Sequence, residues 1–347
     1  MKEEINKLKK AVCNHQHLTD CSRNLITHLD FKSHLPIKVI IGASYVGKTT
    51  LKKVIINNYI KSYAKEVSDE AYLPIVHINL DSASTSQKTM LSGLRQILQV
   101  LDTEFYSVKG RIYKDALKGE KASPSNRSRM SEIDMRDRIR QLLKARKTKL
   151  LIIDEFHNML HMGSSNDFST RLEFLKNIVN NTDVQVILFG TFALNRSLFA
   201  SAELINRSSF HYLHRYNLDR TIDKQNFIQI IEYFADFFPL EERGALMENR
   251  EILGDKTLGI IGILKYLLID LLIDVLSENK RINPELIYGH ARSGYELRTI
   301  ENEIREGESE LEQNKKFRNN NSFKGHNRKP GKRKPSRDPF NKEDGEA

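Results

Sequence analysis

The segment from Gly42 to Thr49 carries the strongest chemical signal in the sequence. It reads Gly-Ala-Ser-Tyr-Val-Gly-Lys-Thr and matches the phosphate-binding pattern G-x-x-x-x-G-K-[ST]. The glycines of this pattern let backbone N–H groups surround a β-phosphate at a helix N-terminus. Lys48 would add positive charge toward the β- and γ-phosphates, and the Thr49 hydroxyl could ligate Mg²⁺. The sequence therefore predicts a site for ATP and Mg²⁺, held by Gly42, Ala43, Ser44, Tyr45, Val46, Gly47, Lys48, Thr49 and Thr50.

Two adjacent carboxylates follow an apolar run further along the chain. Leu150 to Ile153 leads directly into Asp154 and Glu155, as expected of a strand that ends at a metal-binding and water-activating pair. Asp154 is predicted to hold Mg²⁺ through water, and Glu155 to orient and polarise the attacking water. Thr191 follows another apolar run and could sense the γ-phosphate, although a simple strand-to-loop turn explains it too.

Several basic side chains could complete the site. Arg207 follows a short helical segment and is the preferred arginine finger, a side chain that stabilises charge at a neighbouring subunit's nucleotide. Arg196 and Arg215 compete for that role, and a solvated surface arginine is nearly as good an explanation of each. Lys265, near the start of a later helix, could contact phosphate. The predicted catalytic set is Lys48, Asp154, Glu155, Thr191 and Arg207.

A basic segment between residues 109 and 129 is a candidate DNA-binding surface. It holds seven basic and two acidic residues, and phosphate contacts by lysine and arginine bind DNA without reading its sequence. A solvated insertion is an equally good explanation. The candidate DNA-binding residues are Lys109, Arg111, Lys114, Lys118, Lys121, Arg127 and Arg129.

The cysteines and histidines near the N-terminus do not have the spacing of a known zinc site. Cys13, His15, His17 and Cys21 are ligand types at short spacing, but we expect them to lie on an N-terminal helical segment without metal. His157, beside the acid pair, could hydrogen-bond Glu155 or couple the nucleotide state to DNA. It could equally be a buried histidine of no special function.

The order of the elements predicts an α/β domain. Apolar or β-branched runs at 37–41, 73–80, 150–154 and 184–189 alternate with helical patterns at 49–63, 84–101, 131–145 and 167–180. Such alternation favours a parallel sheet with right-handed crossovers. From residue 222 the patterns at 222–237, 241–250, 257–278 and 284–313 are all helical. We expect an N-terminal helical segment (1–35), an α/β ATPase domain (36–218), a helical lid (219–313) and a tail (314–347).

Composition and charge narrow the class of protein. The chain has 347 residues, 39% hydrophobic, two cysteines and a net charge of +10, which excludes a disulfide-rich or wholly disordered protein. No apolar stretch is long enough to span a membrane, and a reducing cytoplasm fits best. Ten basic residues and no acidic one lie between Asn314 and Arg337. This tail should be disordered when free, and it could bind either DNA or a protein partner.

Together the motifs resemble those of the AAA+ ATPases that regulate transposition, the TniB/TnsC family. The resemblance covers roughly residues 15–280 and rests on four runs: Ile40–Thr50, Leu151–Asn158, Leu188–Thr191 and Gly259–Gly262. It implies an AAA+ fold with a parallel five-stranded sheet and a small helical lid. Tyr45 stands where the family usually has glycine, so we expect a negative φ there, and Lys265 stands where many AAA+ proteins have arginine.

The resemblance also implies a function. Proteins of this family bind ATP at subunit interfaces, assemble as rings or filaments around double-stranded DNA, and link a target selector to the transposase. Two alternatives stay open: a nucleotide-gated DNA scaffold with negligible hydrolysis, and a replication-initiator or loader-type AAA+ ATPase.

Overall fold

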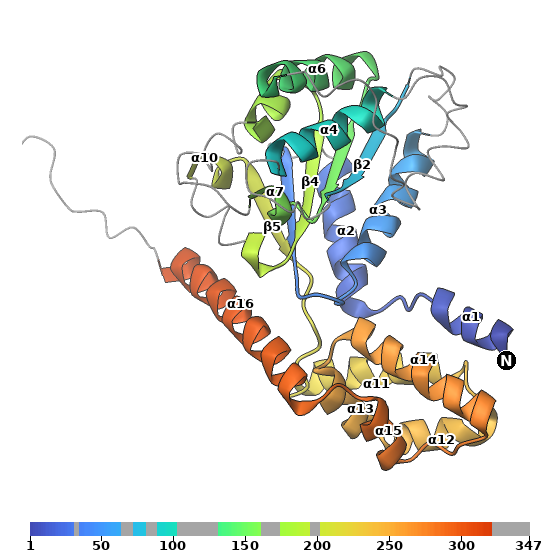
Figure 1. Ribbon diagram of the computed structural model, residues 1–347. Helices are drawn as coiled ribbons and strands as arrows, with labels where there is room; N and C mark the ends of the chain where they lie inside the picture. Colours follow the sequence, from blue (N-terminus) through green and yellow to red (C-terminus); the bar gives the residue numbers. More distant parts are fainter. Residues whose placement is uncertain are drawn as a thin grey trace, which may run out of the picture. The chain divides into compact units, whose positions relative to one another are not determined.

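The computed structural model describes residues 1–30, 35–63, 72–80, 89–102, 131–160, 174–194 and 202–320 (Figure 1). The chain forms two units, Met1–Glu301 and Asn302–Ala347, and the site described below lies wholly within the first. Among the described residues, no helix is both long and apolar enough to cross a bilayer.

A parallel sheet forms the centre of the α/β part. Within the described residues it has five strands in the order β2-β3-β4-β1-β5. The strands are β1 (Ile37–Ile41), β2 (Ile75–Asn79), β3 (Leu150–Asp154), β4 (Gln185–Gly190) and β5 (Ser208–Tyr212). Every residue of β1, β3 and β4 is buried, as expected of parallel strands that are covered on both faces.

Helices cover the two faces because the chain reverses its direction across the sheet. It runs from β1 to the β2 edge and then returns through β3 and β4, so right-handed crossovers put α3 on one face and α4 and α6 on the other. Accordingly α3 packs with α2, and α4 with α6 (Figure 1). These helices are α2 (Gln16–Asp30), α3 (Lys48–Tyr63), α4 (Thr89–Asp102) and α6 (Glu132–Ala145), with two short ones, α7 (His157–Leu160) and α10 (Ala202–Ile205).

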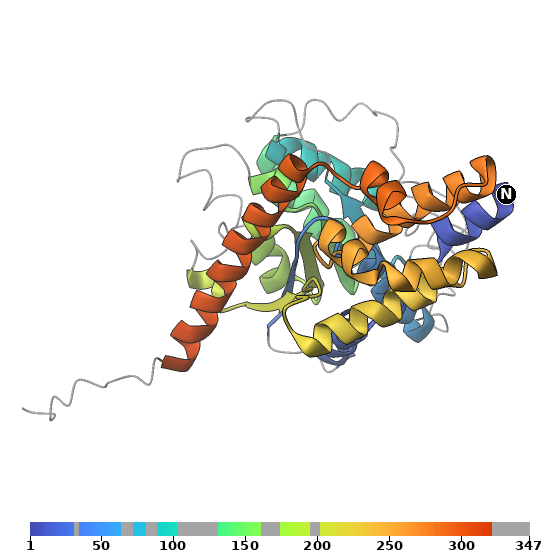
Figure 2. The ribbon, with the colours of Figure 1, turned by 90° about the horizontal axis from the view of Figure 1, so that it is seen from below.

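The rest of the described chain is helical. It comprises α11 (Thr221–Ala235), α12 (Leu240–Glu248), α13 (Arg250–Thr257), α14 (Ile261–Glu278), α15 (Pro284–His290) and α16 (Gly294–Asn320). The apolar side chains of α11 to α15 share one core, and Leu8 of α1 (Lys2–Lys10) is buried in it. Figure 2 shows α1 beside α14. We call α11 to α15 the lid; α1 packs as an additional helix of this bundle.

Most predicted elements are present, and several bounds differ. The strands at 37–41 and 150–154 are confirmed to the residue, and the helix predicted from Ser131 begins with a capping box at that serine. The apolar and β-branched runs in the sequence predicted the positions of four strands. They did not predict the fifth, Ser208–Tyr212. The single helix predicted over 284–313 is wrong: it is broken at 291–293, and α16 continues to Asn320, past the expected start of the tail. The basic segment 109–129 lies outside the described residues.

Candidate functional site

Three sequence motifs meet at the carboxyl edge of the sheet. Residues 42–47 follow β1, Asp154 ends β3, and Thr191 follows β4. Backbone hydrogen bonds join these ends: Gly42 N donates to the Gly190 carbonyl at 3.4 Å, and Phe156 N to the Phe189 carbonyl at 3.0 Å. The sheet therefore brings together residues that are far apart in the sequence, as the motifs predict.

The loop 42–47 closes around the ammonium of Lys48. Lys48 Nζ donates to the carbonyl oxygens of Gly42 and Ala43, at 2.8 and 2.7 Å, and the side chain is buried. Gly47 has a φ of +110°, which only glycine adopts readily. Thr49 is exposed in the first turn of α3, where its hydroxyl belongs to a helix N-terminus that favours anions.

Tyr45 corrects one expectation. Its φ is +63° rather than negative, a left-handed conformation that costs an L-residue about 1–2 kcal/mol. Two contacts with the lid offset this cost. The Tyr45 carbonyl accepts a hydrogen bond from Gly262 N at 3.0 Å, and its ring meets Tyr266 edge to face with centroids 5.6 Å apart. The phosphate loop is thereby joined to the first turns of α14.

Asp154 forms a buried ion pair that the sequence motifs do not reveal. Lys52 Nζ lies 2.5 Å from Asp154 Oδ2, and the two residues are each only 6% exposed. The other carboxylate oxygen, Oδ1, accepts a hydrogen bond from Glu155 N at 2.9 Å. Lys52 lies one helical turn after Lys48, a spacing that places both on one face of α3. That spacing is the signal that could have identified it.

Glu155 directly follows Asp154, and the pKa of its carboxyl group is raised. Burial, and then the neighbouring charge of Asp154, raise the pKa of its carboxyl group, while Lys48 and Lys52 oppose the rise. His157 Nδ1 lies 3.2 Å from Glu155 Oε2, but its geometry is not that of the hydrogen bond predicted from the sequence. A carboxylate with a raised pKa accepts a proton more readily, which suits the activation of water.

His77 of β2 lies near the Asp154 carboxylate, whose charge acts on its pKa. Neither of its ring nitrogens has a hydrogen-bond partner among the described residues. Burial, and then the charge of Lys52, lower its pKa to about 4, although Asp154 acts in the opposite direction. His77 is therefore neutral near pH 7 and leaves the charge balance around Asp154 to Lys52.

The chemistry of Thr49 and Asp154 fits Mg²⁺. A hydroxyl and a carboxylate are hard oxygen donors of the kind that Mg²⁺ prefers, and a carboxylate with two accepted hydrogen bonds keeps unused lone pairs. Elsewhere in the described part of the chain, no group of three or more His, Cys, Asp or Glu side chains is placed to hold a metal ion.

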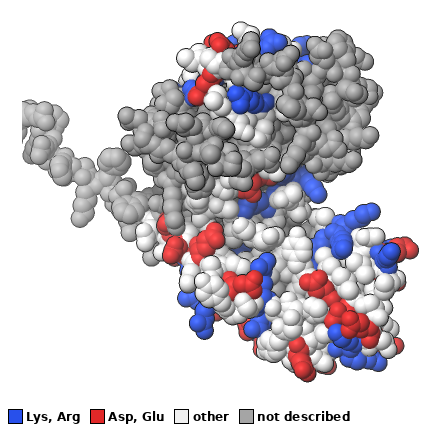
Figure 3. All heavy atoms as spheres, viewed as in Figure 1, with Lys and Arg blue, Asp and Glu red and all other residues white. Residues whose placement is uncertain are grey.

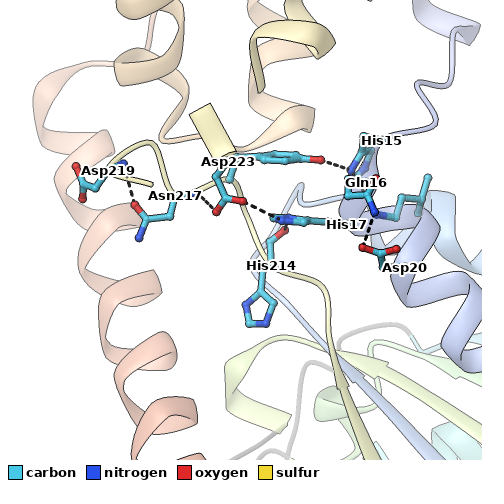
Figure 4. Close-up of polar contacts among 10 residues, drawn as sticks. His15, Gln16, His17, Asp20, His214, Asn217, Asp219 and Asp223 are labelled. Carbon is cyan, nitrogen blue, oxygen red and sulfur yellow. Dashed lines mark hydrogen bonds and ion pairs between the residues drawn. The ribbon is translucent and has the colours of Figure 1, made fainter. Parts of the chain in front are cut away.

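His15 and His17 contact Tyr216, and His17 also reaches Asp223 of α11 (Figure 4). His15 Nδ1 lies 3.0 Å from the Tyr216 hydroxyl, and its Nε2 would lie 4.0 Å from a Cβ added at Gly47. His17 stacks on the Tyr216 ring, with centroids 4.2 Å apart, and its Nε2 lies 3.3 Å from Asp223 Oδ1 of α11. Burial lowers the pKa of His15 to about 4, so this imidazole is neutral near pH 7.

The basic residues that were predicted to complete the site lie in different parts of the chain. Lys265 Nζ donates to the carbonyl oxygens of Lys9 and Ala11, at 2.9 and 2.6 Å, so it caps the C-terminal end of α1. Arg215 donates to the Leu258 carbonyl at 3.1 Å, and Arg196 lies outside the described residues. Contact of Lys265 with phosphate stays a prediction.

Arg207 lies at the opposite edge of the sheet from the phosphate loop. It directly precedes β5, and its carbonyl accepts a hydrogen bond from the N–H of Ile37, the first residue of β1. Its guanidinium donates to the Asn180 side chain. Since β1 has five residues, at about 3.3 Å per residue roughly 15 Å separates Arg207 from the loop of its own chain.

The predicted DNA-binding residues, from Lys109 to Arg129, all lie outside the described residues. On the face shown in Figure 3, Lys and Arg side chains of the described residues alternate with Asp and Glu. That face offers no continuous basic surface among the described residues. DNA binding by the 109–129 segment stays a prediction.

The α/β fold is that of AAA+ proteins. The sequence matches the AAA domain family over residues 32–198. Comparison with curated protein sequences gave no significant match.

Solved structures of AAA+ proteins share the fold at low sequence identity. The ORC2 protein of Aeropyrum pernix, solved in ADPNP–ADP complexes, is 15% identical with a TM-score of 0.54, over 84% of this chain and 73% of that one. Cdc6p from Pyrobaculum aerophilum is 14% identical with a TM-score of 0.52, over 81% and 68%. A Walker-type ATPase of Pyrococcus abyssi is 13% identical with a TM-score of 0.50, over 86% and 76%.

Proposed function

We propose that this chain is an ATP-hydrolysing AAA+ protein that binds nucleotide between copies of itself and acts on double-stranded DNA. The observation that carries the proposal is the meeting of Lys48, Asp154 and Glu155 at one edge of the sheet. A phosphate-binding loop, a metal-holding carboxylate and a carboxylate of raised pKa are the parts that γ-phosphoryl transfer to water requires.

Each group has a distinct role in the proposed reaction. Backbone amides of residues 42–47 and the ammonium of Lys48 bind and orient the β- and γ-phosphates. Glu155 accepts a proton from the water that attacks the γ-phosphorus, and Thr191 hydrogen-bonds a γ-phosphate oxygen. Mg²⁺, held by Thr49 and, through water, Asp154, would neutralise charge on the phosphate oxygens.

The nucleobase would lie beside the N-terminal segment. A groove of about 510 Å³ is lined by residues 12–16 and by one side of α11, including Asn226, Gln229 and Tyr233. Amide side chains can hydrogen-bond the edge of a base while apolar neighbours cover its faces. His15, which lines this groove and also approaches Gly47, would lie between the base and the phosphates.

A second copy of the chain would complete the site. Arg207 is roughly 15 Å from the loop of its own chain, so it could reach the nucleotide of a neighbour and not its own. In a head-to-tail assembly the Arg207 edge of one copy faces the phosphate-loop edge of the next, and such interfaces generate rings or helical filaments. Hydrolysis would then depend on assembly.

For the biological process we propose regulation of DNA transposition. The support is the order of the motifs: the phosphate loop, Asp154-Glu155 followed by His157, Gly190-Thr191, and Gly259 to Gly262. On this proposal the ring or filament forms on target duplex DNA through the 109–129 segment, and it links a target selector to the transposase. The basic tail would bind DNA or one of these proteins.

The second candidate is a replication-initiator or loader-type ATPase. It is favoured by the likeness of the fold to the ORC2 protein and Cdc6p. The two candidates predict different partners. A transposase would be recruited to DNA by the ATP-bound protein in the first case, and a replicative helicase in the second. Pull-down of each with DNA-bound protein would separate the two.

Steady-state ATPase activity with and without duplex DNA tests the enzymatic proposal. We expect DNA to raise turnover, and Glu155→Gln to lower it by on the order of a hundredfold or more, because general-base catalysis contributes about 10²–10⁴-fold. The matched control is Glu251→Gln, an exposed carboxylate on α13 that pairs with Lys224. A Glu155→Gln protein with unchanged turnover would contradict hydrolysis at this site and favour the nucleotide-gated scaffold.

DNA coating tests the link to nucleotide. Lys48→Ala removes the ammonium that binds the phosphates, so we expect ATP-dependent coating of DNA to disappear in electron micrographs. Filaments or rings formed by Lys48→Ala at wild-type density would show that assembly does not need the triphosphate.

A further inference from the structure

The buried Lys52–Asp154 pair places a lysine ammonium against the carboxylate that is proposed to hold Mg²⁺. Lys52 Nζ is 2.5 Å from Asp154 Oδ2, and both side chains are almost fully enclosed. A lysine ammonium is a compact point charge that donates hydrogen bonds and cannot accept them. It therefore acts at this oxygen as a cation that is part of the protein.

The neighbouring charged groups leave this role to Lys52. The ammonium of Lys48 donates to the loop carbonyls of Gly42 and Ala43. His77 makes no hydrogen bond to Asp154, because neither of its ring nitrogens has a partner among the described residues. Without Lys52, the carboxylates of Asp154 and Glu155 would face the phosphates with no other enclosed cation directly on Asp154 in the described part of the chain.

Two consequences follow for a nucleotide at this site. A neutralised Asp154 repels a triphosphate much less than a free carboxylate would, so nucleotide binding needs less help from a divalent ion. Conversely, a divalent ion held through water by Asp154 is repelled by the Lys52 ammonium, which weakens its binding. Both effects act in the same direction and reduce the dependence of nucleotide binding on Mg²⁺.

We infer that Lys52 is a built-in counter-ion of Asp154, which lets the chain hold nucleotide without Mg²⁺ and weakens the binding of Mg²⁺ at this carboxylate. The inference rests on the proposed nucleotide site and adds a positioning residue to it. If the pair were only structural, its loss would lower stability and leave the Mg²⁺ dependence of nucleotide binding unchanged.

Binding of the fluorescent nucleotide mant-ATP to the full chain tests this, in EDTA and across a Mg²⁺ titration. The wild type should bind almost equally well in both conditions. Lys52→Met keeps most of the side-chain volume and removes the charge, so affinity in EDTA should fall roughly tenfold or more. Added Mg²⁺ should restore it to near the affinity of the wild type. The control, Lys53→Met, removes an exposed charge from the next position of α3 and should behave as the wild type.

The double variant Lys52→Met/Asp154→Asn covers the case in which the single variant fails to fold. Replacing a buried ion pair by neutral residues of similar size avoids an unpaired buried charge. In this variant Mg²⁺ should change the affinity for mant-ATP much less than it does in Lys52→Met.

The outcomes separate the inference from the proposed function. The role of Lys52 is refuted if Mg²⁺ changes the affinity for mant-ATP by the same factor in the wild type and in Lys52→Met. It is also refuted if the double variant responds to Mg²⁺ as strongly as Lys52→Met does. Failure of the wild type to bind mant-ATP under any condition would refute the nucleotide site itself. A second readout needs no nucleotide: millimolar MgCl₂ should raise the melting temperature of Lys52→Met, whose Asp154 is free, and leave that of the wild type unchanged.

Discussion

Gly262→Ala should weaken nucleotide binding from a distance by separating the lid from the phosphate loop. A Cβ added at Gly262 would lie 2.5 Å from the Tyr45 carbonyl oxygen and 2.9 Å from the Tyr45 Cβ. The oxygen belongs to the backbone of a loop already at positive φ, so it cannot move aside as the end of a side chain could. The first turn of α14 must therefore move away from the loop.

The magnitude follows from the steric clash and from the hydrogen bond that it breaks. Overpacking of a close contact costs about 1–3 kcal/mol, and breaking the 3.0 Å hydrogen bond from Gly262 N to Tyr45 O costs about 1 kcal/mol. Alanine regains at most about 1 kcal/mol over glycine within a helix. The net destabilisation of roughly 1–3 kcal/mol corresponds to a fall in nucleotide affinity of about five- to a hundredfold, if binding needs the docked lid.

The assay is mant-ATP affinity together with limited proteolysis of the lid. Gly289→Ala is the matched control, because a Cβ at Gly289 of α15 would meet nothing within 4 Å. We expect this control to bind as the wild type does and to be slightly more stable. The reasoning is refuted if Gly262→Ala binds mant-ATP as tightly as Gly289→Ala and its lid resists protease equally well.

Two further predictions concern buried ionisable groups. Lys38 of β1 is fully buried, and burial lowers its pKa from 10.5 to about 8. Lys38→Met should therefore raise the free energy of unfolding at pH 7 by about 1–3 kcal/mol in urea titrations. Between pH 8 and 10.5 the folded wild type has released the Lys38 proton while the unfolded chain still holds it, so a rise in pH stabilises the wild type and the gain should shrink. A gain that does not change with pH would point to packing instead. His15, His77 and His211 have pKa values lowered to about 4, chiefly by burial. Stability should be full above pH 6.5 and fall by about 1–3 kcal/mol for each histidine as pH drops to 4, because the unfolded chain takes up protons first. A urea midpoint that does not change over this range would contradict their neutral state.

The sequence by itself determined the parts of the site whose geometry is local. A phosphate loop needs a fixed spacing of glycine, lysine and threonine between a strand and a helix, and the whole arrangement lies within residues 37–63. The strand that ends at Asp154 is similarly visible, since a buried parallel strand is a continuous apolar run. Both strands can be predicted to the residue because no distant part of the chain is needed to define them.

The fifth strand shows where local patterns fail. Ser208–Tyr212 has only one buried residue, and its polar side chains give no apolar run. It is a strand because its backbone pairs with β1, residue for residue from Ile37 to Ile41. Pairing of this kind is a property of the sheet and leaves little trace in the composition of an edge strand.

Only the tertiary structure decided which distant residues act together. Lys52 and Asp154 are 102 positions apart, and their ion pair exists because α3 packs against the sheet beside the end of β3. Lys265 has a predicted phosphate contact, yet it caps α1, because Leu8 docks that helix in the core of the lid. Side-chain partners are set by packing between elements, and the spacing of residues along the chain contains no direct record of that packing.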